Sequence, residues 1–146
     1  MPRTAQHAVG LTNAQRVGDL LRATAEAGTR TPEAAALFLD GMDAEVVFDP
    51  TRVWPDATVY RGRDGVRQFF DRWLRGWEEY RHDVIEVLEA GSYVVVVLHE
   101  HGRARASGIE VDHVFAQLWQ LHDGKVTSWR AYRTKQEALE AAGVRR

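Results

Sequence analysis

The 146-residue chain contains no cysteine. Disulfide bonds, cysteine-ligated zinc, iron–sulfur clusters and a thiol nucleophile are therefore excluded. An excess of charge of one sign is also missing, because 19 basic residues are balanced by 21 acidic ones and the formal net charge is −2. A weakly acidic chain is a poor candidate for binding a phosphate backbone, so we expect no nucleic-acid partner.

Long hydrophobic runs are absent as well. The longest apolar run, Val94–Leu98, is far shorter than the roughly 20 residues that a membrane-spanning helix needs. No basic and apolar signal segment opens the chain, which favours a cytoplasmic location and no membrane partner. Aromatic residues are plentiful, however, and five tryptophans, four tyrosines and five phenylalanines can bury enough apolar surface for one folded domain.

Caps and apolar spacing predict three helices in the first half of the chain. A capping box at Thr12 starts a helix that Gly28 can close. Thr31, followed by proline, starts a second helix that stops near Gly41. Asp64 can cap the third helix, which presents one broad apolar stripe. The stripe consists of Val66, Phe69, Phe70, Trp73, Leu74 and Trp77.

The remainder of the chain reads mainly as strand. Short strands are predicted at residues 45–48 and 59–60, and longer ones at 80–89, 93–104, 109–121 and 126–133, before a last helix at 136–142. Consecutive strands with short turns indicate an antiparallel meander. The run Val94–Leu98 lacks polar alternation, so both of its faces should be covered. Helices segregated to one face of a curled antiparallel sheet give an α+β fold.

Three pieces of the sequence resemble the SnoaL-like group of the nuclear transport factor 2-like superfamily. Residues 44–50 followed by 60–66 resemble the family's first strand and the start of its third helix. Residues 118–126 resemble its closing hairpin. Residues 129–132 resemble its final strand, particularly that of limonene epoxide hydrolase.

The resemblance implies a single domain over residues 12–142, between a flexible N-terminus (1–11) and a C-terminal tail (143–146). Its sheet would be a cone-shaped, curled antiparallel sheet with three helices packed on the concave face. The sheet and helices would enclose an apolar pocket for a small hydrophobic molecule, without cofactor or metal. Family members pair through exposed sheet faces, so a homodimer is implied. They include isomerases, cyclases, dehydratases, hydrolases and non-catalytic binders, so fold alone assigns no activity.

Which strand residues face that pocket depends on the turn around residues 123–124, because strand side chains alternate between faces. A two-residue turn would place Leu118 on the side of Trp129, whereas a three-residue turn over residues 122–124 would place Gln117 there. Comparison with the family favours the second. The side chains then predicted to face the pocket are Val95, Val97, His99, His101, Arg103, His113, Phe115, Gln117, Trp119, Trp129, Ala131 and Arg133. A slip of one residue would reverse these assignments.

Asp49 is the first candidate for catalysis. In ketosteroid isomerases, which this segment resembles, the general base is the aspartate of an acid-proline pair at the same place. At the rim of an apolar cavity the charged carboxylate is disfavoured, so its pKa rises and it becomes a usable base. The alternative is an ordinary Asp-Pro turn, in which the side chain bonds nearby backbone.

His99, His101 and Arg103 are the next catalytic candidates. Strand alternation places them on one face, and histidine titrates near neutral pH, which suits proton transfer. The alternative is a pair of strand-end histidines satisfied by hydrogen bonds or water. A metal site with His113 would lack both the helical histidine spacing and a clear carboxylate ligand, so no metal is predicted.

The predicted ligand-binding residues are mainly aromatic. Trp54 lies in a loop and is a candidate lid. Phe69 and Trp73 could line the wall, although such a stripe is more often core, and Gln117 could donate to an oxyanion. The full set is Trp54, Phe69, Trp73, His113, Phe115, Gln117, Trp119, Trp129 and Arg133.

These residues favour an enzyme of isomerase, lyase or cyclase type that uses acid–base chemistry on a small apolar carbonyl or hydroxyl compound. The known catalytic sets are incomplete, because the isomerase's first-helix tyrosine has no counterpart. The epoxide hydrolase's two acids are also missing: His101, Arg103 and Ala131 stand at the matching positions of its arginine and acids. The alternatives are a non-catalytic dimeric binding module for a small hydrophobic ligand, and an assembly protein with a filled cavity.

Overall fold

The computed structural model describes residues 11–28 and 31–144. Within them the order is α2 (Asn13–Glu26), α3 (Pro32–Asp40), β1 (Met42–Asp49), β2 (Tyr60–Arg61), α4 (Gly62–Arg75), β3 (Trp77–Ala90), β4 (Tyr93–Ala104), β5 (Glu110–His122), β6 (Lys125–Tyr132) and α5 (Lys135–Ala141). The fold is α+β, as expected. The predicted flexible N-terminus lies outside the described residues apart from Leu11, as do residues 145–146 of the predicted tail.

The helix starts follow from their caps. The Thr12 hydroxyl accepts a hydrogen bond from the backbone N–H of Gln15 (3.0 Å), and the Gln15 side chain accepts one from the Thr12 N–H (2.8 Å). Thr31 caps α3 ahead of its proline. Both predicted caps are confirmed. Arg61, not Asp64, occupies the N-cap of α4, and Trp77 begins β3 because the helix stops at Gly76.

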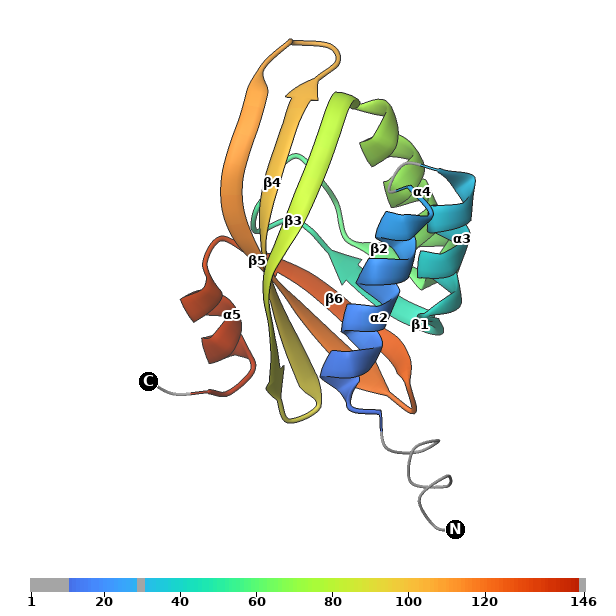
Figure 1. Ribbon diagram of the computed structural model, residues 1–146, viewed down its shortest axis with the longest axis vertical. Helices are drawn as coiled ribbons and strands as arrows, with labels where there is room; N and C mark the ends of the chain where they lie inside the picture. Colours follow the sequence, from blue (N-terminus) through green and yellow to red (C-terminus); the bar gives the residue numbers. More distant parts are fainter. Residues whose placement is uncertain (1–10, 29–30, 145–146) are drawn as a thin grey trace.

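Within the described residues the strands form one curled sheet in the order β2-β1-β6-β5-β4-β3. Neighbouring strands are antiparallel except β1 and β6, which run parallel, so the sheet is mixed. A parallel pair needs a long crossover, and here β2 to β5 intervene between the two strands. Helices α2, α3 and α4 cover the concave face, and α5 lies against the opposite face (Figure 1).

The run Val94–Leu98 of strand β4 is buried on both faces. Val94, Val96 and Leu98 belong to the core beneath α2, α3 and α4, and Val95 and Val97 belong to the core beneath α5. All five are at most 6% exposed. The prediction that both faces of this run are covered is confirmed, and its lack of polar alternation has a direct physical cause.

The hairpin between β5 and β6 turns in two residues, because His122 pairs with Lys125. Asp123 and Gly124 both have positive φ (51° and 79°), as a type I′ turn requires. The predicted three-residue turn is wrong. A bulge where Thr127 stands supplies the extra residue instead, so Trp119 still pairs with Trp129. The predicted facing of β5 and β6 therefore holds, for a different reason.

The register between β4 and β5 reverses the predicted facing of β4. Leu98 pairs with Phe115 and Glu100 with His113, so even-numbered residues of β4 share a face with odd-numbered residues of β5. The connection fixes this parity where the Ala104 N–H donates to the Ile109 carbonyl (2.9 Å). The predicted inward facing of Val95, Val97, His99, His101 and Arg103 is therefore wrong.

No helix among residues 11–28 and 31–144 combines the length and the apolar character needed to cross a membrane.

Candidate functional site

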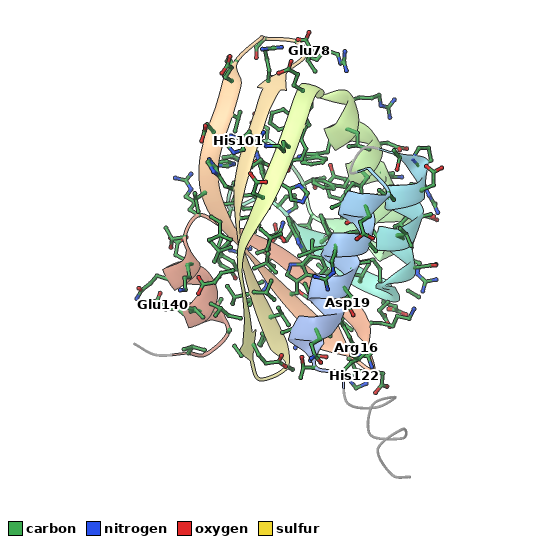
Figure 2. The ribbon with its side chains drawn as sticks, in the orientation of Figure 1. Arg16, Asp19, Glu78, His101, His122 and Glu140 are labelled. Atoms are coloured by element: carbon green, nitrogen blue, oxygen red, sulfur yellow. The ribbon has the colours of Figure 1, made fainter. Side chains whose placement is uncertain are left out.

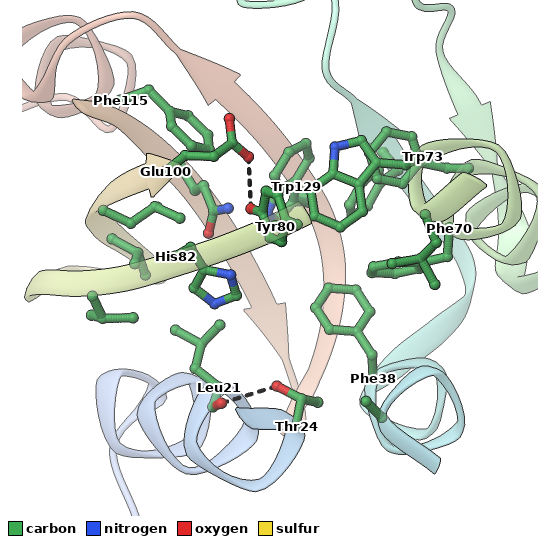
Figure 3. Close-up of a pocket in the computed structure, with 18 of the residues that line it drawn as sticks. Leu21, Thr24, Phe38, Phe70, Trp73, Tyr80, His82, Glu100, Phe115 and Trp129 are labelled. Atoms are coloured by element: carbon green, nitrogen blue, oxygen red, sulfur yellow. Dashed lines mark hydrogen bonds between the residues drawn. The ribbon is translucent and has the colours of Figure 1, made fainter. Parts of the chain in front are cut away.

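A cavity of about 80 Å³ lies between the concave face of the sheet and the helices (Figure 3). This volume is several times the ~10–15 Å³ that a single buried water needs. Most of the lining is apolar or aromatic. The predicted ligand-binding residues that line it are Trp54, Phe69, Trp73, Phe115, Gln117, Trp119 and Trp129.

Aromatic rings form a continuous wall around the cavity. Phe48 of β1 stacks on Trp129 of β6, with ring centroids 4.0 Å apart and an angle of 6° between planes. Trp54, in the loop between β1 and β2, meets Phe115 edge-on at 5.2 Å. Phe69 is 8% exposed and belongs to the core as well as to the lining, so its core and cavity interpretations both apply.

Glu100 is the buried acid of this cavity, with 1% exposure. The Tyr80 hydroxyl donates to Glu100 Oε2 (2.7 Å), and His113 Nε2 lies 2.7 Å from Oε1. Burying a carboxylate costs several kcal/mol unless close partners compensate, so both neighbours stabilise it. Burial and the Glu100 charge raise the pKa of Tyr80, so its phenol keeps its proton and remains a donor.

His82 points into the cavity from β3, where it pairs with Glu100 of β4 (Figure 3). Burial lowers the pKa of His82, despite the nearby charges of Glu100 and Asp83. Its ring is therefore neutral at pH 7. Its Nδ1 is buried and has no hydrogen-bond partner within the described part of the chain.

Trp73 presents a second buried polar atom without a partner in the described residues, its indole Nε1. An unpaired buried donor or acceptor costs about 1–3 kcal/mol. Trp73 and His82 line the same cavity, so two such groups at one place indicate a site that a polar ligand or water completes.

Gln117 offers a third polar group to the cavity. The Trp119 indole N–H donates to Gln117 Oε1 (3.0 Å). An indole nitrogen can only donate, so this contact fixes which end of the amide is the oxygen. The amide nitrogen of Gln117 is then the end left for a ligand acceptor.

Asp49 adopts the turn arrangement that was the alternative to its role as a base. Its Oδ1 accepts from the Thr51 N–H (2.9 Å) and hydroxyl (2.6 Å), and its Oδ2 accepts from Arg52 (3.1 Å). Burial would raise the pKa of Asp49, but these bonds and the Arg52 charge outweigh burial and hold the pKa below its ordinary value. Phe48 faces the cavity, so its neighbour Asp49 faces away. The predicted cavity position of Asp49 is wrong.

The other predicted catalytic residues lie on the outer face of the sheet. His99 and His101 contact Asp112 there, and Arg103 pairs with Glu79 at 2.9 Å. Arg133 is exposed and donates to the Arg52 carbonyl, so it does not line the cavity either. His113 reaches the site through Glu100, as the inward facing of β5 predicted.

Sequence reasoning missed the three polar residues Tyr80, His82 and Glu100 of the site. The sequence does carry a signal for each of them. Tyr80 and His82 alternate on one strand and therefore share a face. Glu100 shares a strand face with Val96 and Leu98, because alternate residues of a strand point the same way. The sequence alone does not say which of the two faces is the inner one.

The chain belongs to the SnoaL-like domain family, whose model matches residues 20–129. The predicted membership of that family is thereby confirmed. No curated protein shows significant sequence similarity to it.

Solved structures similar to this chain share its fold. An NTF2-like protein from Burkholderia thailandensis E264 is 22% identical, with TM-score 0.73, covering 92% of this chain and 99% of that one. A candidate SnoaL-like polyketide cyclase from Jannaschia sp. CCS1 is 21% identical, with TM-score 0.69, covering 88% and 90%. A protein of ketosteroid isomerase-like fold from Catenulispora acidiphila, in complex with trimethylamine, is 16% identical, with TM-score 0.63, covering 84% and 92%.

Proposed function

We propose that this protein is a small-molecule enzyme of isomerase, lyase or cyclase type, which performs acid–base chemistry on a small carbonyl or hydroxyl compound in the cavity. The observation that carries the proposal is Glu100, a carboxylate with 1% exposure at the wall of an aromatic cavity. Similarity to a candidate polyketide cyclase supports the same class of chemistry. The catalytic set differs from the one that the sequence suggested.

The proposed reaction begins with proton transfer from a carbon beside the carbonyl group to Glu100. The C–H bonding electrons form a C=C bond to the carbonyl carbon, the C=O π electrons move to the oxygen, and the substrate becomes an enolate. The Trp73 N–H and the Gln117 amide can donate hydrogen bonds to that oxygen. Tyr80 holds Glu100 in place, and the protonated Glu100 can return its proton to a second carbon of the enolate. The neutral His82 can form a hydrogen bond to the substrate through its unpartnered Nδ1.

The test is exchange of α-protons, because it requires proton abstraction and no knowledge of the natural substrate. We would incubate the protein with 2-tetralone and related bicyclic ketones in D₂O and follow deuterium incorporation by NMR. Glu100→Gln should slow exchange by about 10²- to 10⁴-fold, the range that positioned proton transfer supplies. Tryptophan fluorescence would check that the variant still binds the ketone.

Glu110→Gln is the matched control, because it is the same chemical change at an exposed position of β5. It should leave exchange unchanged, as should Asp49→Asn. If Glu100→Gln binds ketone and exchanges protons at the wild-type rate, Glu100 is not the base.

A non-catalytic binding module for a small hydrophobic ligand is the second candidate function. The mainly apolar and aromatic lining favours it, because such a surface holds a ligand without any chemistry. Ketones that bind to the wild-type protein but exchange no faster than in buffer would favour this function over the enzyme.

A further inference from the structure

Two histidines and an aspartate converge on the outer face of the sheet, away from the cavity. His99 and His101 alternate on β4, and their ring centroids are 3.8 Å apart. Asp112 of β5 pairs directly with His101 in the sheet. One nitrogen or oxygen atom from each of the three residues lies within 4.8 Å of the others. Figure 2 shows His101 on the long strands, remote from the hairpin that carries His122.

The contacts within this group point its polar atoms at one another. His99 Nε2 lies 2.6 Å from Asp112 Oδ1, and His101 Nδ1 lies 3.4 Å from Asp112 Oδ2. The second nitrogen of His101, Nε2, faces Asp83 Oδ2 of β3 at 3.7 Å. His101 therefore stands between two carboxylates, one for each ring nitrogen.

We propose that His99, His101 and Asp112 form a binding site for a divalent transition-metal ion of the zinc type. Imidazole nitrogen and carboxylate oxygen are ligands that Zn²⁺ prefers, and three protein ligands leave a position for water. Asp83 is a positioning residue, because it can accept a hydrogen bond from the ring nitrogen of His101 that does not bind the metal. Such carboxylate–histidine–metal chains orient the ligating ring.

The spacing suits a metal after small side-chain rotations. Two ligand atoms bonded to zinc at about 2.1 Å stand at most about 4.2 Å apart, against the 4.8 Å limit within which the three atoms lie here. The backbone positions are fixed by the paired strands β4 and β5. The side chains are accessible to an ion, because His99, His101 and Asp112 are 33%, 28% and 68% exposed.

The charges around the site favour a cation. Asp112 and Asp83 contribute two carboxyl groups, which lie 3.4 and 3.7 Å from the two ring nitrogens of His101. The nearby Arg81 contacts Asp83, with its Nε 3.7 Å from Asp83 Oδ2. Arg103 is engaged by Glu78, Glu79 and Glu110. Asp112 therefore remains available to an ion.

The test is calorimetric titration of the full-length chain, carrying no affinity tag, with Zn²⁺ at pH 7.5. We expect one equivalent to bind, and Mg²⁺ not to compete, because magnesium prefers oxygen ligands. Asp112→Asn and His101→Gln should each remove binding, and Asp83→Asn should weaken it by about 10- to 100-fold, the usual effect of losing an outer partner. Co²⁺ in place of Zn²⁺ should give visible absorption bands that Asp112→Asn abolishes.

His122→Gln is the matched control, because His122 also stands beside an aspartate, Asp123, at 3.4 Å. It lies on an exposed hairpin and should leave zinc affinity unchanged. Glu100→Gln should also leave it unchanged, which separates this site from the cavity. No zinc binding at 100-fold excess, or binding that survives Asp112→Asn, would overturn the proposal and leave the cluster as ion pairs alone.

Discussion

Gly102 is the position where one methyl group should most clearly disturb the aromatic packing behind the cavity, because the Trp77 ring lies against it. A Cβ atom at this residue would lie 2.5 Å from Cζ3 of Trp77 and 2.9 Å from the backbone oxygen of Glu79. The indole has little room to retreat, because it packs against Trp73 and Tyr80 with ring centroids 6.2 and 5.2 Å away. The carbonyl belongs to the paired strand β3 and is held by the sheet.

We therefore expect Gly102→Ala to lower the free energy of unfolding by about 2–3 kcal/mol, the upper part of the usual range for overpacking. For a chain of this size that corresponds to a fall in melting temperature of about 4–12 °C. Urea unfolding followed by tryptophan fluorescence measures the change. Gly18→Ala is the matched control: a Cβ there meets nothing within 4 Å, and alanine in a helix should stabilise by about 0.5–1 kcal/mol.

A double-mutant cycle identifies the clash. In a Trp77→Ala background the ring contact is gone, so Gly102→Ala should cost less there, with a coupling energy of about 1 kcal/mol or more. Part of the cost should persist, because the Glu79 carbonyl remains. Gly102→Ala within 0.5 kcal/mol of the wild type would refute this account of the close approach between Gly102 and Trp77.

Four further predictions concern the acid–base groups and the assembly. Tyr80→Phe leaves Glu100 Oε2 without its donor and should lower the free energy of unfolding by about 1–3 kcal/mol in urea. The pKa of Asp49 is lowered in the folded protein. Ionised Asp49 therefore stabilises the fold above about pH 4, and this contribution is lost as the pH falls through the folded-state pKa. The difference in free energy of unfolding between the wild type and Asp49→Asn should accordingly shrink between pH 7 and pH 2. The pKa of His82 is also lowered, so the unfolded chain binds more protons below pH ~6.5 and stability should fall there, less so in His82→Gln. We also propose a homodimer, which light scattering would test against a monomer.

Local sequence signals predicted the elements of this fold well. The caps at Thr12 and Thr31 each depend on a few neighbouring residues, and these patterns carry their physical cause within them. The hairpin after β5 was placed correctly in the sequence, but the length of its turn was predicted wrongly. Long-range features were harder to predict. The parallel pairing of β1 with β6 and the position of α5 on the outer face depend on contacts between distant segments, which no local pattern encodes.

The facing of β4 is where sequence reasoning about the site failed, and α5 explains why. Alternation reveals the inner face of a strand only when the outer face is polar. Here α5 covers the outer side of Val95 and Val97, so that both faces of the run are apolar. The family comparison then decided the parity, and it was off by one residue.

Beyond the reach of α5 the alternation returns, and it points to the register that the structure has. The odd positions His99, His101 and Arg103 are polar and partly exposed. The even positions hold Glu100, which is buried, and Gly102, on which the Trp77 ring packs. Three polar side chains in alternation are typical of a strand whose one face is exposed to solvent. A single carboxylate among buried neighbours therefore marks the cavity more reliably than the conspicuous pair of histidines beside it.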